Sequence, residues 1–170
     1  MTLLEVPTLV SPLTVVNALL DRVESALVAC NAAPITRKYP AAGLVAWDDC
    51  CGMLVAAPER IYRTASFPTE GPDENGCFDG FIALDCVTQL VRCISVMDDA
   101  GNPPSAQTLD DEYSMILLEG GIIWNALGEG YEGWESTNLS QAYIGAEGGC
   151  IGIETRITVG VDEEEFCPGC

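Results

Sequence analysis

The side chains best suited to chemistry are cysteines, of which the chain has nine. The most suggestive motif is Cys167-Pro168-Gly169-Cys170, because a C-x-x-C pair can form half of a zinc site, a redox couple or a disulfide. The other cysteines lack the spacing of a zinc ribbon. Cys50 and Cys51 are adjacent, and Cys86 and Cys93 lie on opposite faces of one expected strand. We therefore expect buried free thiols before disulfides and disulfides before metal, and we predict no metal site and no cofactor.

Carboxylates are the second candidates for chemistry, because the chain has 26 acidic residues. Adjacent acids such as Asp48-Asp49 and Asp98-Asp99 are more typical of solvated turns than of the paired acids of a glycosidase. The sequence has no histidine, which removes the commonest general base and zinc ligand. No P-loop or dinucleotide fingerprint occurs, because Gly120-Gly121 and Gly148-Gly149 lack the required spacing. The sequence therefore predicts a protein that is not an enzyme.

The acidic balance limits the classes of partner. Only 7 basic residues oppose the 26 acidic ones, giving a net charge of −19, whereas a groove that grips DNA or RNA is basic. The acidity indicates either simple solubility or a surface that faces DNA without holding it. No run of about 18 apolar residues occurs, and the N-terminal segment lacks the features of a secretory signal, so no membrane association is expected.

Two amphipathic helices are predicted. Ser11-Pro12 supplies the cap and first position of a helix over 13–30, whose apolar residues recur at helical spacing. Ser105 or Thr108 caps the second helix, which has acids in its first turn. Gly120 in this helix is expected to allow close packing on the sheet. The expected buried stripe of the second helix comprises Tyr113, Ile116, Leu117, Gly120, Ile123, Trp124 and Leu127.

The remaining pattern is that of β-strands. A strand over 53–67 is expected, with an edge or a bulge at Pro58. The longest β pattern covers 78–96 and is apolar on both faces, which indicates a central strand or a subunit contact. Segments 141–146 and 150–161 form a predicted hairpin.

The order of helix, strands, helix, strands predicts an α+β fold. It consists of a mostly antiparallel sheet with two helices packed on one face. We expect a single domain over 1–161, followed by an acidic, cysteine-containing C-terminal tail over 162–170.

Several motifs together resemble one family of proteins. They are Val45-Ala46-Trp47-Asp48-Asp49-Cys50-Cys51-Gly52, then Arg60-Ile61-Tyr62, Phe67-Pro68, Val91-Arg92-Cys93 and Asp98-Asp99-Ala100-Gly101-Asn102-Pro103-Pro104-Ser105. This combination resembles neck proteins of long-tailed phages that infect actinobacteria, the head-to-tail connector and tail terminator proteins. The resemblance covers residues 13–161, and the order of elements is similar to that of the tail terminator fold.

The resemblance implies a structural protein of the siphophage virion, assembled in the host cytoplasm. Tail terminators form a hexameric ring that caps the finished tail tube, stops its polymerisation and offers a surface to the head. The implied partners are further copies of the chain, the tail tube protein and head-side connector proteins. Double-stranded DNA would pass through the lumen without specific binding, and an acidic wall would let it slide. The resemblance implies no catalytic residue.

A ring needs heterologous contacts between its copies. We expect these contacts on the two-sided strand, through Phe81, Val87 and Val91, and on the aromatic loop over 128–139, through Tyr131 and Trp134. The acids expected to line or rim the lumen are Asp73, Glu74, Asp98, Asp99, Asp162 and Glu163.

Two alternative functions remain at this point. The first is another ring of the neck: a helical bundle would favour an adaptor, and a small closed barrel would favour a head-to-tail stopper. The second is a metal or redox module that uses Cys167 and Cys170.

Overall fold

The computed structural model describes residues 10–43, 47, 51–76 and 80–162. Within them, two helices and five strands follow one another along the chain. They are α1 (Pro12–Ala29), β1 (Arg37–Pro40), β2 (Met53–Thr64), β3 (Phe81–Cys93), α2 (Ala106–Gly128), β4 (Trp134–Glu147) and β5 (Cys150–Asp162). Among these residues, no helix combines the length and hydropathy needed to cross a bilayer.

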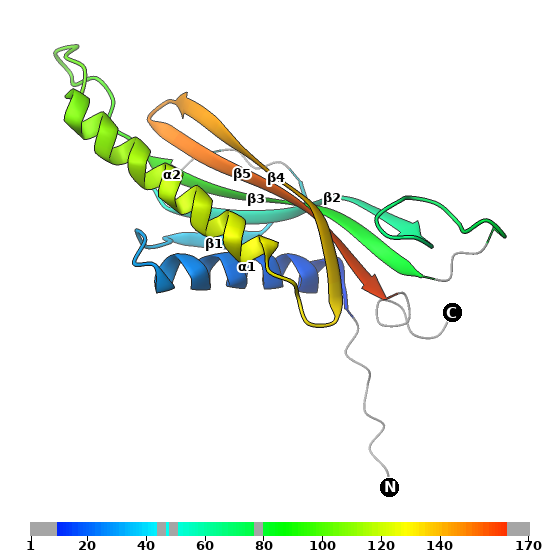
Figure 1. Cartoon of the computed structure of the whole chain (residues 1–170). Coiled ribbons are helices and arrows are strands. Elements are labelled where there is room, and N and C mark those ends of the chain that lie inside the picture. The colour runs from blue at the N-terminus through cyan, green and yellow to red at the C-terminus, as the bar shows by residue number, and fades with distance from the viewer. Residues whose placement is uncertain (1–9, 44–46, 48–50, 77–79, 163–170) are drawn as a thin grey trace, which may run out of the picture.

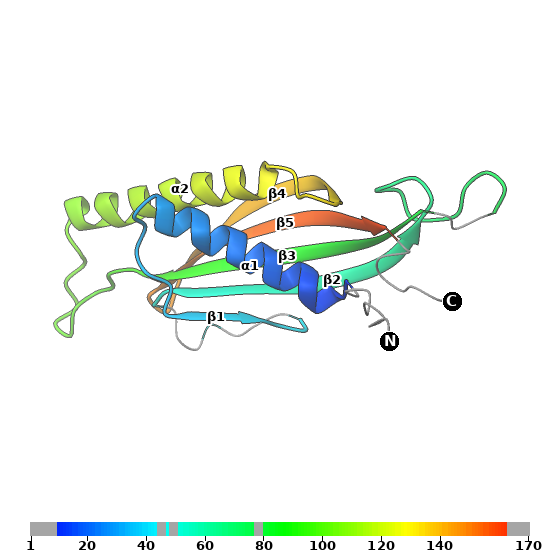
Figure 2. The same cartoon turned by 90° about the horizontal axis from the view of Figure 1, so that it is seen from below.

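The five strands form one sheet in the order β1-β2-β3-β5-β4. Strand β1 runs parallel to β2, and every other pair of neighbours is antiparallel. Both helices pack on the same face of this sheet (Figures 1 and 2). The predicted α+β fold, with a mostly antiparallel sheet and two helices on one face, is therefore confirmed.

The central strand β3 carries the core because its side chains alternate between the two faces. Leu84 and Leu90 belong to the main core with the two helices, and their register partners on β5, Val159 and Ile153, lie beside them. The opposite face holds a smaller cluster of Met53, Val55, Val91 and Cys150, with Tyr39, Ala41 and Trp47 packed against it. Both apolar faces of β3 are therefore buried by other parts of the same chain.

The helix caps follow from the sequence. The side chain of Ser11 accepts a hydrogen bond from the backbone N–H of Thr14, and the Thr14 hydroxyl accepts one from the N–H of Ser11. This reciprocal arrangement is a capping box. Of the two caps considered for the second helix, Ser105 is the one used, and it accepts from Thr108 N at 3.1 Å.

The strands differ from expectation in two places. The predicted loop over 128–139 is shorter, because β4 already begins at Trp134 and pairs with β5 through Trp134 and Val161. Register shifts between Thr137 and Ser140 interrupt the alternation in this part of the strand, which conceals it in the sequence. The four-residue β1 was not predicted, since it is short and ends at a proline.

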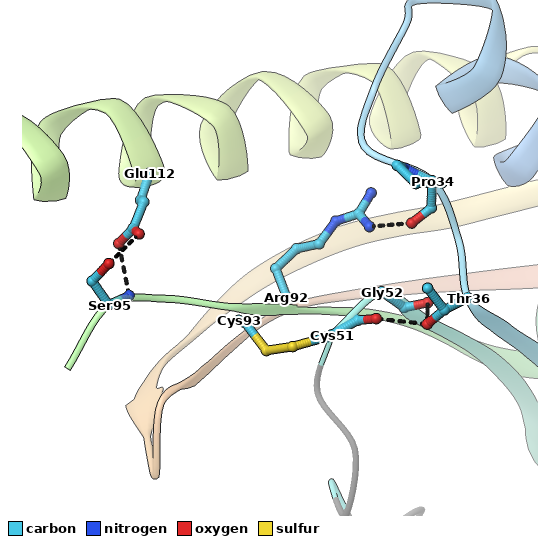
Figure 3. Close-up of a disulfide and its surroundings, with 8 residues drawn as sticks. All are labelled: Pro34, Thr36, Cys51, Gly52, Arg92, Cys93, Ser95 and Glu112. Atoms are coloured by element: carbon cyan, nitrogen blue, oxygen red, sulfur yellow. Dashed lines mark hydrogen bonds between the residues drawn. A yellow bond between two sulfur atoms is a disulfide. The ribbon is translucent and has the colours of Figure 1, made fainter.

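A buried ion pair joins the sheet to α2. Arg92 on β3 and Glu119 on α2 are only 8% and 4% exposed, and two N–H groups of Arg92 meet the two Glu119 carboxylate oxygens at 2.9 and 2.6 Å. Two further N–H groups of Arg92 donate to the carbonyls of Pro34 (Figure 3) and Ala33 at 3.0 and 2.8 Å. One guanidinium therefore fixes β3, α2 and the connection after α1 relative to one another.

We predict that Glu119→Gln lowers the free energy of unfolding by about 3–5 kcal/mol, because it leaves the Arg92 charge buried without its counter-charge. Urea denaturation followed by circular dichroism measures the loss. The double variant Arg92→Met/Glu119→Leu removes both charges and should recover most of the stability. A single variant as stable as the parent would contradict this role of the pair.

Candidate functional site

The acids expected around a lumen are divided between the two ends of the molecule. Asp73 and Glu74 lie in the connection between β2 and β3, and Asp162 ends β5 at the same end of the sheet. Asp98 and Asp99 lie in the connection between β3 and α2, at the opposite end (Figure 1). The 13 residues of β3 separate the two groups by roughly 40 Å. All five are exposed, but the fold does not bring them together in one subunit.

Asp98 also has a structural role in its own turn. Its carboxylate accepts hydrogen bonds from the backbone N–H groups of Ala100 and Asn102 and from the side chain of Asn102. These bonds, chiefly that from the Asn102 side chain, lower the pKa of Asp98. The Asp98-Asp99-Ala100-Gly101-Asn102 motif is thus a hydrogen-bonded turn.

The same connection is attached to α2 by Glu112. Its carboxylate accepts from the Ser95 hydroxyl at 2.6 Å and from the Ser95 N–H at 2.9 Å (Figure 3). These hydrogen bonds, the one from the hydroxyl first, lower the pKa of Glu112.

Two of the expected ring contacts on β3 are covered within the chain itself. Val87 and Val91 are 5% and 0% exposed, and Val91 belongs to the small cluster on the face away from the helices. Within one subunit neither side chain offers surface to a neighbouring copy. Phe81 is half-buried and packs against Phe67, with ring centroids 6.0 Å apart.

The two aromatic residues after α2 pack against the main core. The rings of Tyr131 and Trp134 stack at 5.8 Å, and both lie against this core. Arg22 of α1 covers the Tyr131 ring at 4.1 Å and donates to the carbonyls of Glu129 and Gly130. Both aromatics are therefore half-buried, and the loop proposed for contacts is fastened to α1.

The cysteines correct a further expectation. Cys51 and Cys93 form a disulfide across 42 residues of sequence, with their Cα atoms 4.9 Å apart (Figure 3). Cys150 is also disulfide-bonded. The prediction of buried free thiols holds for Cys86, whose burial raises its pKa to about 12, while the thiol of Cys30 is exposed. The sequence could not show this pairing, because only the sheet register brings distant cysteines together.

Several candidate residues lie outside the described part of the chain. These are Glu163 among the lumen acids, Cys167 and Cys170 of the C-x-x-C motif, and Cys50. Among the residues that are described, no three possible ligands of the types His, Cys, Asp and Glu come together as a metal site.

A cavity of about 260 Å³ lies beside the disulfide. Its lining includes Cys51, Cys93, Arg92, Glu119 and Glu112. The guanidinium of Arg92 is occupied by Glu119 and two carbonyls, and Glu112 accepts from the neighbouring connection. The charged groups of the cavity therefore serve the packing of β3 against α2.

The outer face of α2 is the strongest candidate for a functional surface. The predicted buried stripe is divided in the structure: Ile116, Gly120, Ile123 and Leu127 are buried, whereas Tyr113, Leu117 and Trp124 are exposed. The apolar arc of the helix is thus wider than the sheet beneath it can cover. Large exposed apolar patches mark contact surfaces, and the periodicity alone did not distinguish the two parts of the arc.

Gly120 explains how α2 and β4 approach each other. A Cβ atom at this position would collide with the hydroxyl of Tyr143 on β4, and Gln141 on the same strand donates to the Gly120 carbonyl at 3.0 Å. The expectation that this glycine allows close packing is confirmed. Tyr143 is itself partly exposed, so the apolar surface continues from α2 onto the edge strand.

No protein-family model matches the chain, and no curated protein matches it significantly.

We predict that Glu112→Gln destabilises the protein at pH 7 and that this effect disappears in acid. A carboxylate whose pKa is lowered by folding stabilises the fold above its ordinary pKa of 4.5, and this contribution is lost as the pH falls through the lowered value. The difference in melting temperature between the parent and the variant should therefore shrink from pH 7 to pH 3.

The matched control is Asp110→Asn, which removes a charge one half-turn away without touching Ser95. Equal pH dependence in Glu112→Gln and in this control would contradict the assignment.

Proposed function

We propose that the chain is a structural subunit of a siphophage neck. In this proposal it forms a hexameric ring that caps the tail tube, ends tail polymerisation and joins the tail to the head. The observation that carries the choice is the architecture, an open five-stranded sheet with both helices on one face. An adaptor was expected to be a helical bundle and a stopper a small closed barrel, so the arrangement favours the terminator among the neck rings.

The exposed apolar surface supports a function that works by assembly. Leu117 and Trp124 are 59% and 43% exposed on α2, and Tyr143 extends this surface onto β4. Removing such side chains from water stabilises association by roughly 25 cal/mol per Å² of apolar area. A ring subunit uses this free energy to hold its neighbours and needs no catalytic group, and we propose no enzymatic activity and no cofactor.

The charge agrees with a channel for DNA. At −19, the chain repels the phosphate backbone. The exposed acids expected around the lumen lie at the two ends of the elongated sheet, Asp73 and Asp162 at one end and Asp98 and Asp99 at the other. In a ring whose subunits stand along the channel, these ends form its two rims. If the subunits lie radially, one of the two groups faces the lumen. In either arrangement, acids that repel the phosphate backbone lie at the mouths of the passage for double-stranded DNA or along its wall.

A metal or redox module draws less support from the described residues. Cys51 and Cys93 are bonded to each other, and Cys150 is also in a disulfide. These thiols are therefore not available as thiolate ligands for zinc. In the neck reading, the disulfide holds the connection after β1 against the end of β3.

We predict that the purified chain assembles into rings of six copies of the 18.1 kDa subunit. Native mass spectrometry measures the copy number, and negative-stain imaging should show a central hole. Added to its cognate tail tube protein during polymerisation, the chain should appear at one end of each tube and shorten the tubes in proportion to its concentration.

A control reaction without the chain gives the uncapped tube lengths. A chain that stays monomeric both alone and with the tube protein contradicts the proposal. Rings that bind a head-side connector and leave tube length unchanged would favour a stopper or an adaptor.

A further inference from the structure

One edge of the molecule carries an apolar ridge. Tyr113, Leu117 and Trp124 are spaced by four and seven residues, which aligns them on one side of α2. Tyr143 of β4 lies against Gly120, between Leu117 and Trp124 along the helix. We call these four exposed side chains the α2–β4 ridge. Two tyrosines and a tryptophan are the residue types that most often anchor protein interfaces.

The other edge of the molecule carries an apolar hollow of about 270 Å³. It lies between the first turn of α1, the end of β1 and the middle of β2. Its lining residues, which we call the α1–β1 hollow, are Pro12, Leu13, Val16, Pro40, Ala41, Ala42 and Pro58. Leu13 is more than half exposed at its mouth.

The sheet order places the two surfaces on opposite sides of the subunit. Strand β1 is one edge of the sheet and β4 is the other, and Figure 2 shows α2 over the β4 edge and α1 nearer to β1. A surface on one side that fits a different surface on the other side makes a heterologous contact, which closes into a ring when the rotation between copies is suitable.

The uncharged side chains of the ridge and the hollow make a second copy a suitable occupant despite the charge of the chain. Each copy carries −19, so a contact between two copies through acidic surface would be opposed by repulsion. The hollow is lined by uncharged residues and the four ridge side chains are uncharged, although the exposed Asp110 lies seven residues before Leu117 on the same side of α2. The ridge and the hollow therefore let identical acidic chains meet with little like charge in the centre of the contact.

The strand edges favour contact through side chains. Strand β1 has four residues and ends at Pro40, which lacks a backbone N–H. Strand β4 is interrupted by two register shifts, at Thr137/Ser140 and at Ile144/Glu147. Short, proline-containing and bulged edges are poor templates for a continuous ladder between subunits. These edges therefore favour side-chain docking of the ridge over strand pairing as the way to join two copies.

We propose that the α2–β4 ridge of one copy docks into the α1–β1 hollow of the next copy, and that this head-to-tail contact builds the ring. The inference rests on the proposed function, because it names the contact that a neck ring of this chain would use. Each subunit contributes its ridge to one neighbour and its hollow to the other.

The test uses two variants of the full chain that each disable one surface. The ridge variant is Leu117→Glu/Trp124→Glu, and the hollow variant is Leu13→Glu/Ala42→Glu. All four positions are exposed, so both variants should keep the circular dichroism spectrum of the parent. The control is Leu118→Glu, which introduces one such charge at the residue of α2 that follows Leu117. Leu118 is 70% exposed but lies about 100° away from Leu117 around the helix.

In native mass spectrometry, each of the two variants alone should be a monomer instead of a hexamer, while the control should still form hexameric rings. The two variants mixed in equal amounts should give dimers of one ridge variant and one hollow variant. Such a pair retains one intact ridge and one intact hollow that face each other, and it cannot grow further. A ridge that paired with another ridge would give no such dimer.

Two outcomes overturn the inference and leave the proposed function standing. Either the rings survive both double variants, or the mixture stays monomeric at the concentration at which the parent forms rings. A parent chain that forms no ring, alone or with the tube protein, overturns the proposed function as well. If the circular dichroism spectrum shows that the ridge variant is unfolded, the milder variant Trp124→Gln replaces the ridge variant. Trp124→Gln is expected to weaken the rings more than Leu118→Glu does.

Discussion

The buried pair between Arg92 and Glu119 is the interaction on which the rest of the structure depends. It places a charge-assisted, two-pronged hydrogen bond between the central strand and α2, where little water reaches it. The same guanidinium holds the carbonyls of Ala33 and Pro34, which lead from α1 into β1. Because the buried Glu119 carboxylate must face the Arg92 guanidinium, the pair fixes the rotation of α2 about its own axis. That rotation decides which half of the helix's apolar arc is buried.

A helix held in this way leaves apolar surface in water. Leu117 and Trp124 remain outside the core, although Ile116 and Ile123 next to them are fully covered. Exposed apolar area of this kind is a cost to an isolated subunit and a source of free energy for an assembly. This explains how a chain could act by contact alone, and it gives the proposed ring a physical basis that does not depend on any reactive side chain.

The acidity of the chain limits how such an assembly can form. Identical chains of charge −19 repel one another, and salt screens this repulsion over about 10 Å at 0.1 M ionic strength. The exposed acids at the two ends of the sheet, near Asp73 and near Asp98, are separated by the length of β3. Contacts along the two edges of the sheet are therefore compatible with acidic ends that remain in solvent or face a passage for DNA.

The sequence by itself determined the fold class, both helices with the cap of the first at Ser11, and the central, two-sided strand, because these depend on local periodicity and capping chemistry. It left the cap of the second helix open between Ser105 and Thr108. It also determined the net charge and the composition that disfavour an enzyme. The tertiary structure alone decided which apolar residues are buried. Val87 and Val91 are buried within the chain, whereas Leu117 is exposed. Periodicity could not predict this difference, because it identifies an apolar face but not how much of that face other elements bury. The partners of Arg92 and Cys93 were likewise set by sheet register and helix placement, which bring together residues that are 27 and 42 positions apart.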